Sequence, residues 1–307
     1  MRAARRARQI GATALQIFSD NPTAWRRRPE APAEAAQFIA FCAEHGIAPI
    51  AIHASYLINI AGRAEPFASQ SLEGLRHEIG RAPDYGASLV NTHIGSHRGE
   101  GQDAGLGRIA EVVREVLAVT PKDVRLVLEN SAGGGDTLGS RIEELATILE
   151  AVGGPAGQLA FCLDTAHLWG AGYDISTPHG VAAVLERFDV LIGLERLALV
   201  HLNDSKSPLG SRSDRHEHLG AGKIGAAGLA GFLREPRLAG RTTLVMETPG
   251  SEEGYDAVNM RRAWLLHAGA EGLPALPGGA MHLGRRGTGR GPSGTNGGKR
   301  SALRRRG

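Results

Sequence analysis

Seven apolar runs recur along the chain at nearly regular intervals, centred near residues 17, 50, 90, 127, 162, 200 and 245. Each run is short and almost continuously apolar, and polar residues do not alternate with the apolar ones. Such runs are typical of strands that are buried on both faces, as in a parallel sheet. The pattern therefore predicts seven parallel strands.

Amphipathic segments lie between these runs. Apolar residues recur at helical spacing within residues 33–46, 71–86, 107–120 and 141–153, and more weakly within 228–238. Strand and helix thus alternate, which predicts an α/β fold whose parallel strands are joined by right-handed helical crossovers. A closed barrel and an open doubly wound sheet both fit this alternation.

Residues of metal-ligand type stand at the carboxyl ends of six of the seven runs. An open sheet gathers its site at one switch point, whereas a TIM (β/α)8-type barrel builds its site from the ends of many strands. The spread over six strands therefore favours the barrel. The candidate ligands are His53, His93, Glu129, Asp164, His167, His201 and Glu247, with Asp214 and His216 in the loop after the sixth run.

The chemistry of these side chains predicts a metal centre. A single histidine at a strand end is more often an ordinary hydrogen-bonded residue than a ligand. Several carboxylates gathered in one barrel mouth, however, are costly to bury unless cations neutralise them. Histidine nitrogens and carboxylate oxygens without a thiolate suit Zn²⁺, with Mn²⁺ as the alternative. Nine ligands are too many for one ion and suit two or three.

Composition limits the remaining possibilities. With 42% hydrophobic residues, the chain of 307 residues can bury one barrel-sized core, which we place in residues 1–272. Residues 273–307 contain ten glycines, seven arginines and no acidic residue, so we expect a disordered basic tail there. No apolar run reaches the length of about 18 residues that would indicate a membrane span. Having only two cysteines, Cys42 and Cys162, argues against a disulfide framework and favours a cytoplasmic setting.

Several residues in the expected mouth loops are candidates for contacts with a nucleic acid. An exposed aromatic ring there could stack on a base, and basic side chains could contact phosphates. Packing beneath the loop, for the rings, and simple solvation, for the cations, are the ordinary alternatives. The candidates are Trp25, Arg26 (the first residue of a triplet with Arg27 and Arg28), Tyr56, Lys206 and Arg212.

Six segments together resemble the endonuclease IV family of apurinic/apyrimidinic (AP) endonucleases. They are HASYLINIAG, NTHIGSH, LVLENSAGGGDTLG, CLDTAHLWGAGYDI, HLNDSKSPLGSRSDRHEHLGAGKIG and LVMETPG. The resemblance covers roughly residues 8–265, and all nine positions that bind metal in the family carry the expected residue. It implies a TIM barrel with a trinuclear zinc site.

The resemblance also implies roles for individual residues. The implied ligand sets are His53, His93 and Glu129 for one ion, Glu129, Asp164, His201 and Glu247 for a second, and His167, Asp214 and His216 for the third. Glu129, Glu247 and Asp164 would be catalytic, and Tyr56 would enter the DNA at the lesion. The implied reaction hydrolyses the phosphodiester bond 5′ to an abasic site in double-stranded DNA, leaving a 3′-hydroxyl and a 5′-deoxyribose phosphate. We expect a monomer.

Two departures from the family pattern affect these expectations. The family opens with a strand and a glycine-rich loop ahead of its first helix, whereas this sequence begins at the helix, so we expect a barrel that lacks its first strand. The family also often has an arginine where Thr23 stands, and Arg26 is its nearest substitute. A sugar isomerase or epimerase of the xylose isomerase-like barrels is the alternative function, since those enzymes also place such ligands around one or two ions. An inactive, truncated relative is the other alternative.

Overall fold

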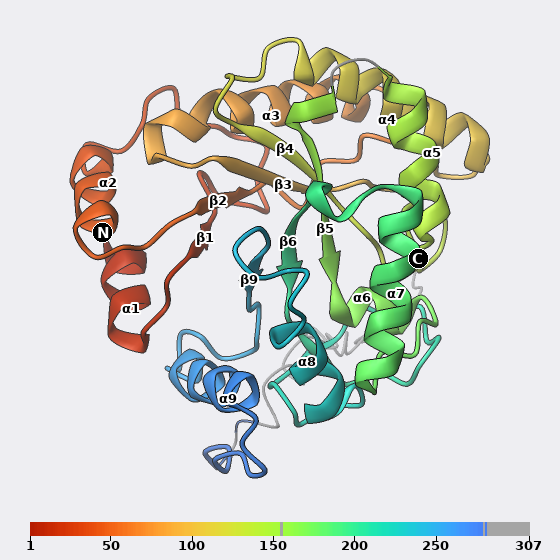
Figure 1. Cartoon of the computed structure of the whole chain (residues 1–307). Coiled ribbons are helices and arrows are strands. Elements are labelled where there is room, and N and C mark those ends of the chain that lie inside the picture. The colour runs from red at the N-terminus through yellow and green to blue at the C-terminus, as the bar shows by residue number, and fades with distance from the viewer. Residues whose placement is uncertain (154–155, 279, 281–307) are drawn as a thin grey trace, which may run out of the picture.

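The computed structural model describes residues 1–153, 156–278 and 280. Its main sheet has seven strands, all parallel, in the order β1-β2-β3-β4-β5-β6-β9 (Figure 1). Their bounds are Leu15–Ile17 (β1), Ile50–His53 (β2), Leu89–His93 (β3), Arg125–Glu129 (β4), Leu159–Asp164 (β5), Leu197–His201 (β6) and Thr243–Val245 (β9). All seven predicted strands are confirmed.

Helices connect the strands and surround them (Figure 1). Their bounds are Arg2–Ile10 (α1), Ala35–Glu44 (α2), Phe67–Arg81 (α3), Gln102–Leu117 (α4), Ile142–Val152 (α5), Thr165–Gly170 (α6), Pro178–Leu191 (α7), Gly225–Leu233 (α8) and Asp256–Ala268 (α9), with short 3₁₀ turns at Ala82–Tyr85 (η1), Ala156–Gln158 (η2) and Leu194–Arg196 (η3). The five predicted helices are present, α1 is the helix at which the sequence was expected to begin, and α6, α7 and α9 are additional to these. The hydroxyl of Thr177 caps α7 by accepting a hydrogen bond from the Gly180 amide at 3.1 Å.

The loop after β6 contains a small antiparallel ribbon, which the sequence pattern did not predict. It pairs β7 (Asp204–Ser205) with β8 (His216–Glu217). Buried Asp204 accepts hydrogen bonds from the backbone amides of Gly222 and Ile224, at 2.9 and 3.0 Å. Because these bonds tie the loop to the start of α8, His216 is held on ordered backbone.

The core has two parts, one between the strands and the helices and one inside the barrel. In β4, Leu128 faces the helices, whereas Val127 belongs to the inner cluster. Successive side chains on a strand point to opposite faces, so Glu129 shares the inward face of Val127. The same two-residue step leads from Ala51 to His53, from Cys162 to Asp164 and from Leu199 to His201. Strand alternation therefore places these ligands around the barrel axis.

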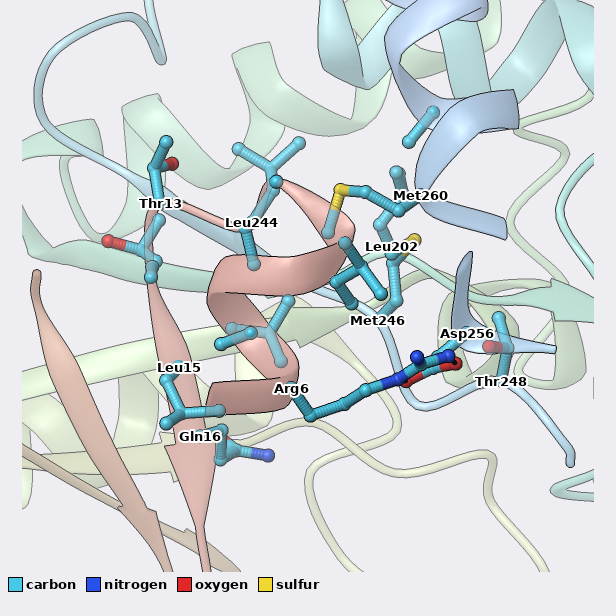
Figure 2. Close-up of a pocket in the computed structure, with 18 of the residues that line it drawn as sticks. Arg6, Thr13, Leu15, Gln16, Leu202, Leu244, Met246, Thr248, Asp256 and Met260 are labelled. Atoms are coloured by element: carbon cyan, nitrogen blue, oxygen red, sulfur yellow. Dashed lines mark hydrogen bonds and ion pairs between the residues drawn. The ribbon is translucent and has the colours of Figure 1, made fainter. Parts of the chain in front are cut away.

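The barrel is open along one seam. Among the described residues, β1 pairs only with β2 and β9 pairs only with β6. Both strands border a groove of about 1680 Å³ (Figure 2). On its outer side α1 packs against α9, where the Arg6 Nε donates to Asp256 Oδ2 at 2.8 Å. The open seven-stranded barrel agrees with the expectation that one strand is lacking.

The first residues after position 272 contact the barrel. Leu273 packs against the core, and the carbonyl of Pro274 accepts a hydrogen bond from Arg262 Nη1 at 2.7 Å. The expected disordered tail falls mainly on residues 281–307, which lie outside the described residues. Within the described part of the chain, no helix combines the length and the apolar character needed to cross a membrane.

Candidate metal centre

All nine predicted ligand residues lie at one end of the barrel. Three groups of these residues, and a fourth that also includes Cys162, present ligand atoms within 4.8 Å of one another, and the groups share Glu129, Asp164 and His201. The groups are His53, His93 and Glu129; Glu129, Cys162 and His201; Asp164, His167 and His216; and Asp164, His201 and Glu247. Asp214 joins them through His167 and His216. The nine residues thus form one connected cluster.

Glu129 lies at the centre of this cluster and is only 1% exposed. Its Oε2 is 3.5 Å from His53 Nε2, and its Oε1 is 3.6 Å from His93 Nε2 and 3.4 Å from His201 Nδ1. Two ligand atoms bound to one tetrahedral zinc ion, each at about 2.0–2.1 Å from the metal, lie about 3.3 Å apart. The spacing around Glu129 therefore fits ligand atoms that share bound cations.

The other two ligand sets have similar spacing. His201 Nδ1 lies 3.2 Å from Glu247 Oε2 and 3.9 Å from Asp164 Oδ2. The Asp214 carboxylate lies between two rings, 3.2 Å from His167 Nε2 and 3.1 Å from His216 Nε2. These distances bring together each of the three sets that the sequence resemblance implies.

Several buried polar atoms in the cluster are left without a hydrogen bond. Glu129 Oε1, His201 Nδ1 and His216 Nε2 have no hydrogen-bond partner among the described residues. Leaving such atoms unsatisfied is costly, and a native protein normally pairs them. All three face the space between the ligand sets, where cations would satisfy them. The residues present therefore fit a multinuclear metal site with nitrogen and oxygen ligands.

Cys162 is the one thiol near these atoms. It lies inside the barrel below Glu129 and His201. Burial raises the pKa of the Cys162 thiol to about 12. Since a thiolate is the form that binds metal, we do not count Cys162 among the ligands. The ligand set stays the mixture of histidines and carboxylates that suits zinc.

Charges within the cluster shift the pKa values of two of its ligands in opposite directions. Burial raises the pKa of Glu247, but His201 outweighs it and holds that pKa at about 2. Burial lowers the pKa of His216, but Asp164 and Asp214 outweigh it and raise that pKa to about 9. At neutral pH the Glu247 carboxylate is therefore ionised and the His216 ring is protonated, and that proton holds a positive charge that a bound cation would replace.

Three buried asparagines form hydrogen bonds with the ligands. They were not among the site residues predicted from the sequence. Asn91 donates to Glu129 Oε2, and Asn203 donates to Asp164 Oδ2 at 2.6 Å while accepting from the Glu247 amide at 2.8 Å. The backbone carbonyl oxygen of Asn130 contacts His167 Nδ1 at 2.9 Å. Each asparagine lies one or two residues along the chain from a ligand at a strand end. That closeness in sequence is the signal that could have predicted their supporting role.

Comparison with known proteins agrees with this geometry. A model of the family described as Xylose isomerase-like TIM barrel matches residues 4–265. The probable endonuclease 4 of Halorhodospira halophila is 40% identical over 90% of this chain and 92% of that protein. The probable endonuclease 4 of Haloarcula marismortui is 39% identical over 80% and 87%, respectively. The crystal structure of endonuclease IV from Thermus thermophilus matches with a TM-score of 0.75 and 38% identity, covering 87% of this chain and 94% of that one.

The chain belongs to the endonuclease IV family. Its fold is shared more widely, since a D-tagatose 3-epimerase-like protein matches with a TM-score of 0.62 at 15% identity. A likeness at that identity concerns the fold alone. The sugar isomerase alternative is therefore not favoured over membership of the endonuclease IV family.

The mouth of this endonuclease IV family member exposes two aromatic rings above the cluster. Tyr56 is 51% exposed, and its ring centroid lies 5.3 Å from that of Phe18 and 5.4 Å from that of His53. Burial of the hydroxyl, with Glu247 and Glu129 nearby, raises the pKa of Tyr56 to about 12, so the phenol stays neutral. Tyr56 thus lies where it was predicted, and Phe18 is a neighbour that sequence reasoning missed.

Two arginines line a cavity of about 330 Å³ beside Tyr56, His93 and Glu129. One is the predicted Arg212, and the other is Arg98, which was not predicted. Both have left-handed backbone, with φ of 53° and 50°. A Cβ on Gly134 would lie 2.9 Å from the Arg212 carbonyl oxygen, so the glycine-rich loop after β4 needs glycine there to approach this closely.

The remaining candidates lie in loops around the mouth. Half-buried Trp25 and exposed Arg26 lie in the loop after β1, and the Tyr56 amide donates to Pro22 in that loop at 3.0 Å. Lys206 follows β7, and its amide donates to the Arg215 carbonyl at 2.9 Å.

Two members of the predicted basic triplet turn toward the protein. Arg28 Nε donates to Asp20 Oδ1 at 2.7 Å, and Arg27 Nη1 donates to the Ala24 carbonyl at 2.8 Å. Arg26 makes no hydrogen bond or ion pair with the described residues. Arg26 is therefore the member of the triplet that remains available to a ligand.

Proposed function

We propose that this chain is a metal-dependent DNA repair endonuclease that hydrolyses the phosphodiester bond 5′ to abasic sites. The products would be a 3′-hydroxyl and a 5′-deoxyribose phosphate. The observation that carries the proposal is the connected cluster of nine ligands, with Asp214 placed between His167 and His216. Sugar isomerases that use one or two ions have no need of this third set. High identity to proteins named endonuclease 4 over most of the chain supports the same reaction.

We propose zinc as the metal, with three ions per chain. Bound cations would lower the pKa of water to about 7 and stabilise the attacking and leaving oxygens of a phosphodiester. Glu129 would hold two ions together, Asp164 and Glu247 would hold the ion on the His201 side, and Asp214 would hold the third. All nine ligands come from a single chain, which supports a monomeric enzyme.

The protein residues at the mouth would position the damaged strand. The exposed rings of Tyr56 and Phe18 offer stacking surfaces beside the cluster. Arg98 and Arg212 flank the adjoining cavity, where their charges would hold phosphates on either side of the lesion. An abasic nucleotide has no base to unstack, so bending the duplex and turning the sugar into the cavity costs least there.

Trp25, Arg26 and Lys206 would make the outer contacts with double-stranded DNA. Trp25 and Arg26 share the loop that is hydrogen-bonded to Tyr56, which would place them on the same side of the lesion as that ring. Lys206 follows β7 in the ribbon that carries His216. These residues would add affinity along the backbone without reading its sequence.

The test is the position of the cut in a duplex that carries one tetrahydrofuran abasic analogue. This analogue has no aldehyde and cannot undergo β-elimination, so a cut requires hydrolysis. With each end of the damaged strand labelled in turn, we expect a single incision 5′ to the analogue and none in an undamaged duplex of the same sequence. Incision 3′ to the analogue, or equal cutting of both duplexes, would contradict the proposal.

A further inference from the structure

The ligand histidines are not all held in the same way. In three of them, Nδ1 contacts a backbone carbonyl: His53 with Ala54 at 2.7 Å, His167 with Asn130 at 2.9 Å and His216 with Glu247 at 3.0 Å. Backbone anchors of this kind fix the ring and leave Nε2 facing the carboxylates. His201 is reversed, because its Nδ1 faces the cluster and its Nε2 is held by a side chain.

That side chain is Gln16, on the edge strand β1. Gln16 Oε1 lies 3.0 Å from His201 Nε2, and Gln16 Nε2 donates to Glu247 Oε1 at 2.9 Å. Gln16 lies along the groove of the open seam (Figure 2). The Gln16 amide on β1 therefore contacts two ligands across the seam, His201 at the end of β6 and Glu247 just after β9.

Hydrogen-bonding chemistry fixes which atom of this amide faces which ligand. An ionised carboxylate can only accept hydrogen bonds, so the amide NH₂ must face Glu247. The amide oxygen then faces His201 Nε2, and two acceptors cannot bond, so Nε2 must carry a proton. In a neutral imidazole the other nitrogen then has a free lone pair. That nitrogen is Nδ1, the atom that faces Glu129, Asp164 and Glu247.

We propose that Gln16 is a positioning residue of the metal centre. Its amide holds His201 with the proton on Nε2 and fixes the Glu247 carboxylate, and so it completes one ligand set across the seam between β1 and β9. The role rests on the metal-dependent function proposed above, but its direct consequence is metal affinity. Gln16 has no part in the other two ligand sets, which should keep their affinity.

The test compares Gln16→Met with the wild-type protein. Methionine keeps the length of the side chain and removes both hydrogen bonds, so a role in packing alone would be preserved. Zinc affinity is measured by competition with a chromogenic chelator, after thermal unfolding has shown that both proteins are folded. We expect one of the bound zinc ions to be held about 10- to 100-fold more weakly in Gln16→Met, the range typical of losing a partner that orients a ligand.

Two further variants separate this role from general damage to the seam. Gln16→Glu keeps an acceptor for His201 Nε2 but removes the donor to Glu247, so we expect its zinc affinity to lie between those of the wild type and Gln16→Met. Thr13→Val changes another residue that lines the same groove and should leave zinc affinity unchanged. Unchanged affinity in Gln16→Met, or an equal loss in Thr13→Val, would overturn the inference.

Cleavage of abasic DNA gives a second readout. Since Gln16 lies below the mouth, we expect Gln16→Met to lower kcat and to leave KM for the DNA unchanged. A raised KM with unchanged kcat would contradict a positioning role. If wild-type protein binds zinc but does not cut, and Gln16→Met still weakens zinc binding, then the proposed function fails and the inference stands. If wild-type protein cuts and Gln16→Met binds zinc normally, the inference alone fails.

Discussion

The two sides of the barrel differ in the length of their strands and in how deeply those strands are buried. Strands β3 to β6 have five or six residues each, and nearly all of these residues are buried. Strands β1 and β9, at the seam, have three residues each, all half-buried. Hydrophobic burial is therefore greater on the closed side, and at the seam polar side chains such as Gln16 and Arg6 add hydrogen bonds between segments that are distant in the chain. Most of the ligands stand on the closed side, which gives the centre a rigid base.

The largest effect should come from the carboxylate at the centre of the closed side. We expect Glu129→Gln to lower cleavage of abasic DNA by well over 100-fold, because losing a mere supporting partner of a metal ligand already costs about 10- to 100-fold. The fold should persist, since glutamine has nearly the same shape. Cleavage rates and circular dichroism check this, with exposed Glu150→Gln on α5 as the matched control. A fully active Glu129→Gln enzyme would show that Glu129 does not bridge.

The second prediction compares stability directly between the two sides. Leu128 in β4 is fully buried, so Leu128→Ala should lower the free energy of unfolding by about 2–5 kcal/mol. Leu244 in β9 is half-buried, so Leu244→Ala should cost only about 1 kcal/mol. Urea unfolding measures both. Equal losses would mean that the seam is packed as firmly as the closed side.

A third prediction concerns the loop after β1, on the seam side. Burial raises the pKa of Asp20, but hydrogen bonds from Arg28 and His77 outweigh it and lower that pKa overall. A lowered folded-state pKa adds stability that is present above the unfolded value of about 3.9 and is lost as the pH falls through the folded value. We therefore expect Asp20→Asn to be less stable than wild type at pH 7, with the difference shrinking below about pH 4. Thermal unfolding across this range measures it.

The control for Asp20 is Asp123→Asn, which changes an exposed aspartate beyond the end of α4. It should be as stable as wild type at every pH. If the difference in thermal stability between Asp20→Asn and wild type stayed constant from pH 7 down to about pH 3, the charge of Asp20 would be excluded as its cause.

The smallest effect should come from the link between α1 and α9. Arg6 forms a two-pronged pair with the Asp256 carboxylate and is 38% exposed. Partly exposed pairs of this kind contribute about 1 kcal/mol or less. We expect Arg6→Ala to lower the free energy of unfolding by that amount. Adding Asp256→Asn to the Arg6→Ala variant should then lower the free energy of unfolding little further. Additive losses in the double variant would show that the two residues do not act as a pair.

The sequence predicted the strands and the ligands because each leaves a local signal. A buried parallel strand is a continuous apolar run, and a histidine or acid directly after it is conspicuous. Burial at the seam leaves no such signal, since the run around Leu15 resembles the run around Leu126 although one is half-buried and the other is fully buried. How deeply a strand is buried depends on neighbours that are distant in the chain.

The residues that orient the ligands were harder to predict. Gln16 is one polar residue within a short apolar run, and its role appears only when β1, β6 and the loop after β9 meet. Arg27 and Arg28 read as surface cations in the sequence, but their partners are a nearby carbonyl and a buried carboxylate. Side-chain direction in loops is set by tertiary contacts that local sequence does not record.

The most direct test of the central claim is a zinc titration of metal-free protein that follows bound zinc and cleavage of the tetrahydrofuran duplex together. Because the nine ligands form one connected cluster, we predict that cleavage is absent from the metal-free protein and rises to its full rate only as the third zinc ion binds. Full cleavage with one bound zinc ion, or with none, would contradict a trinuclear centre as the source of the activity.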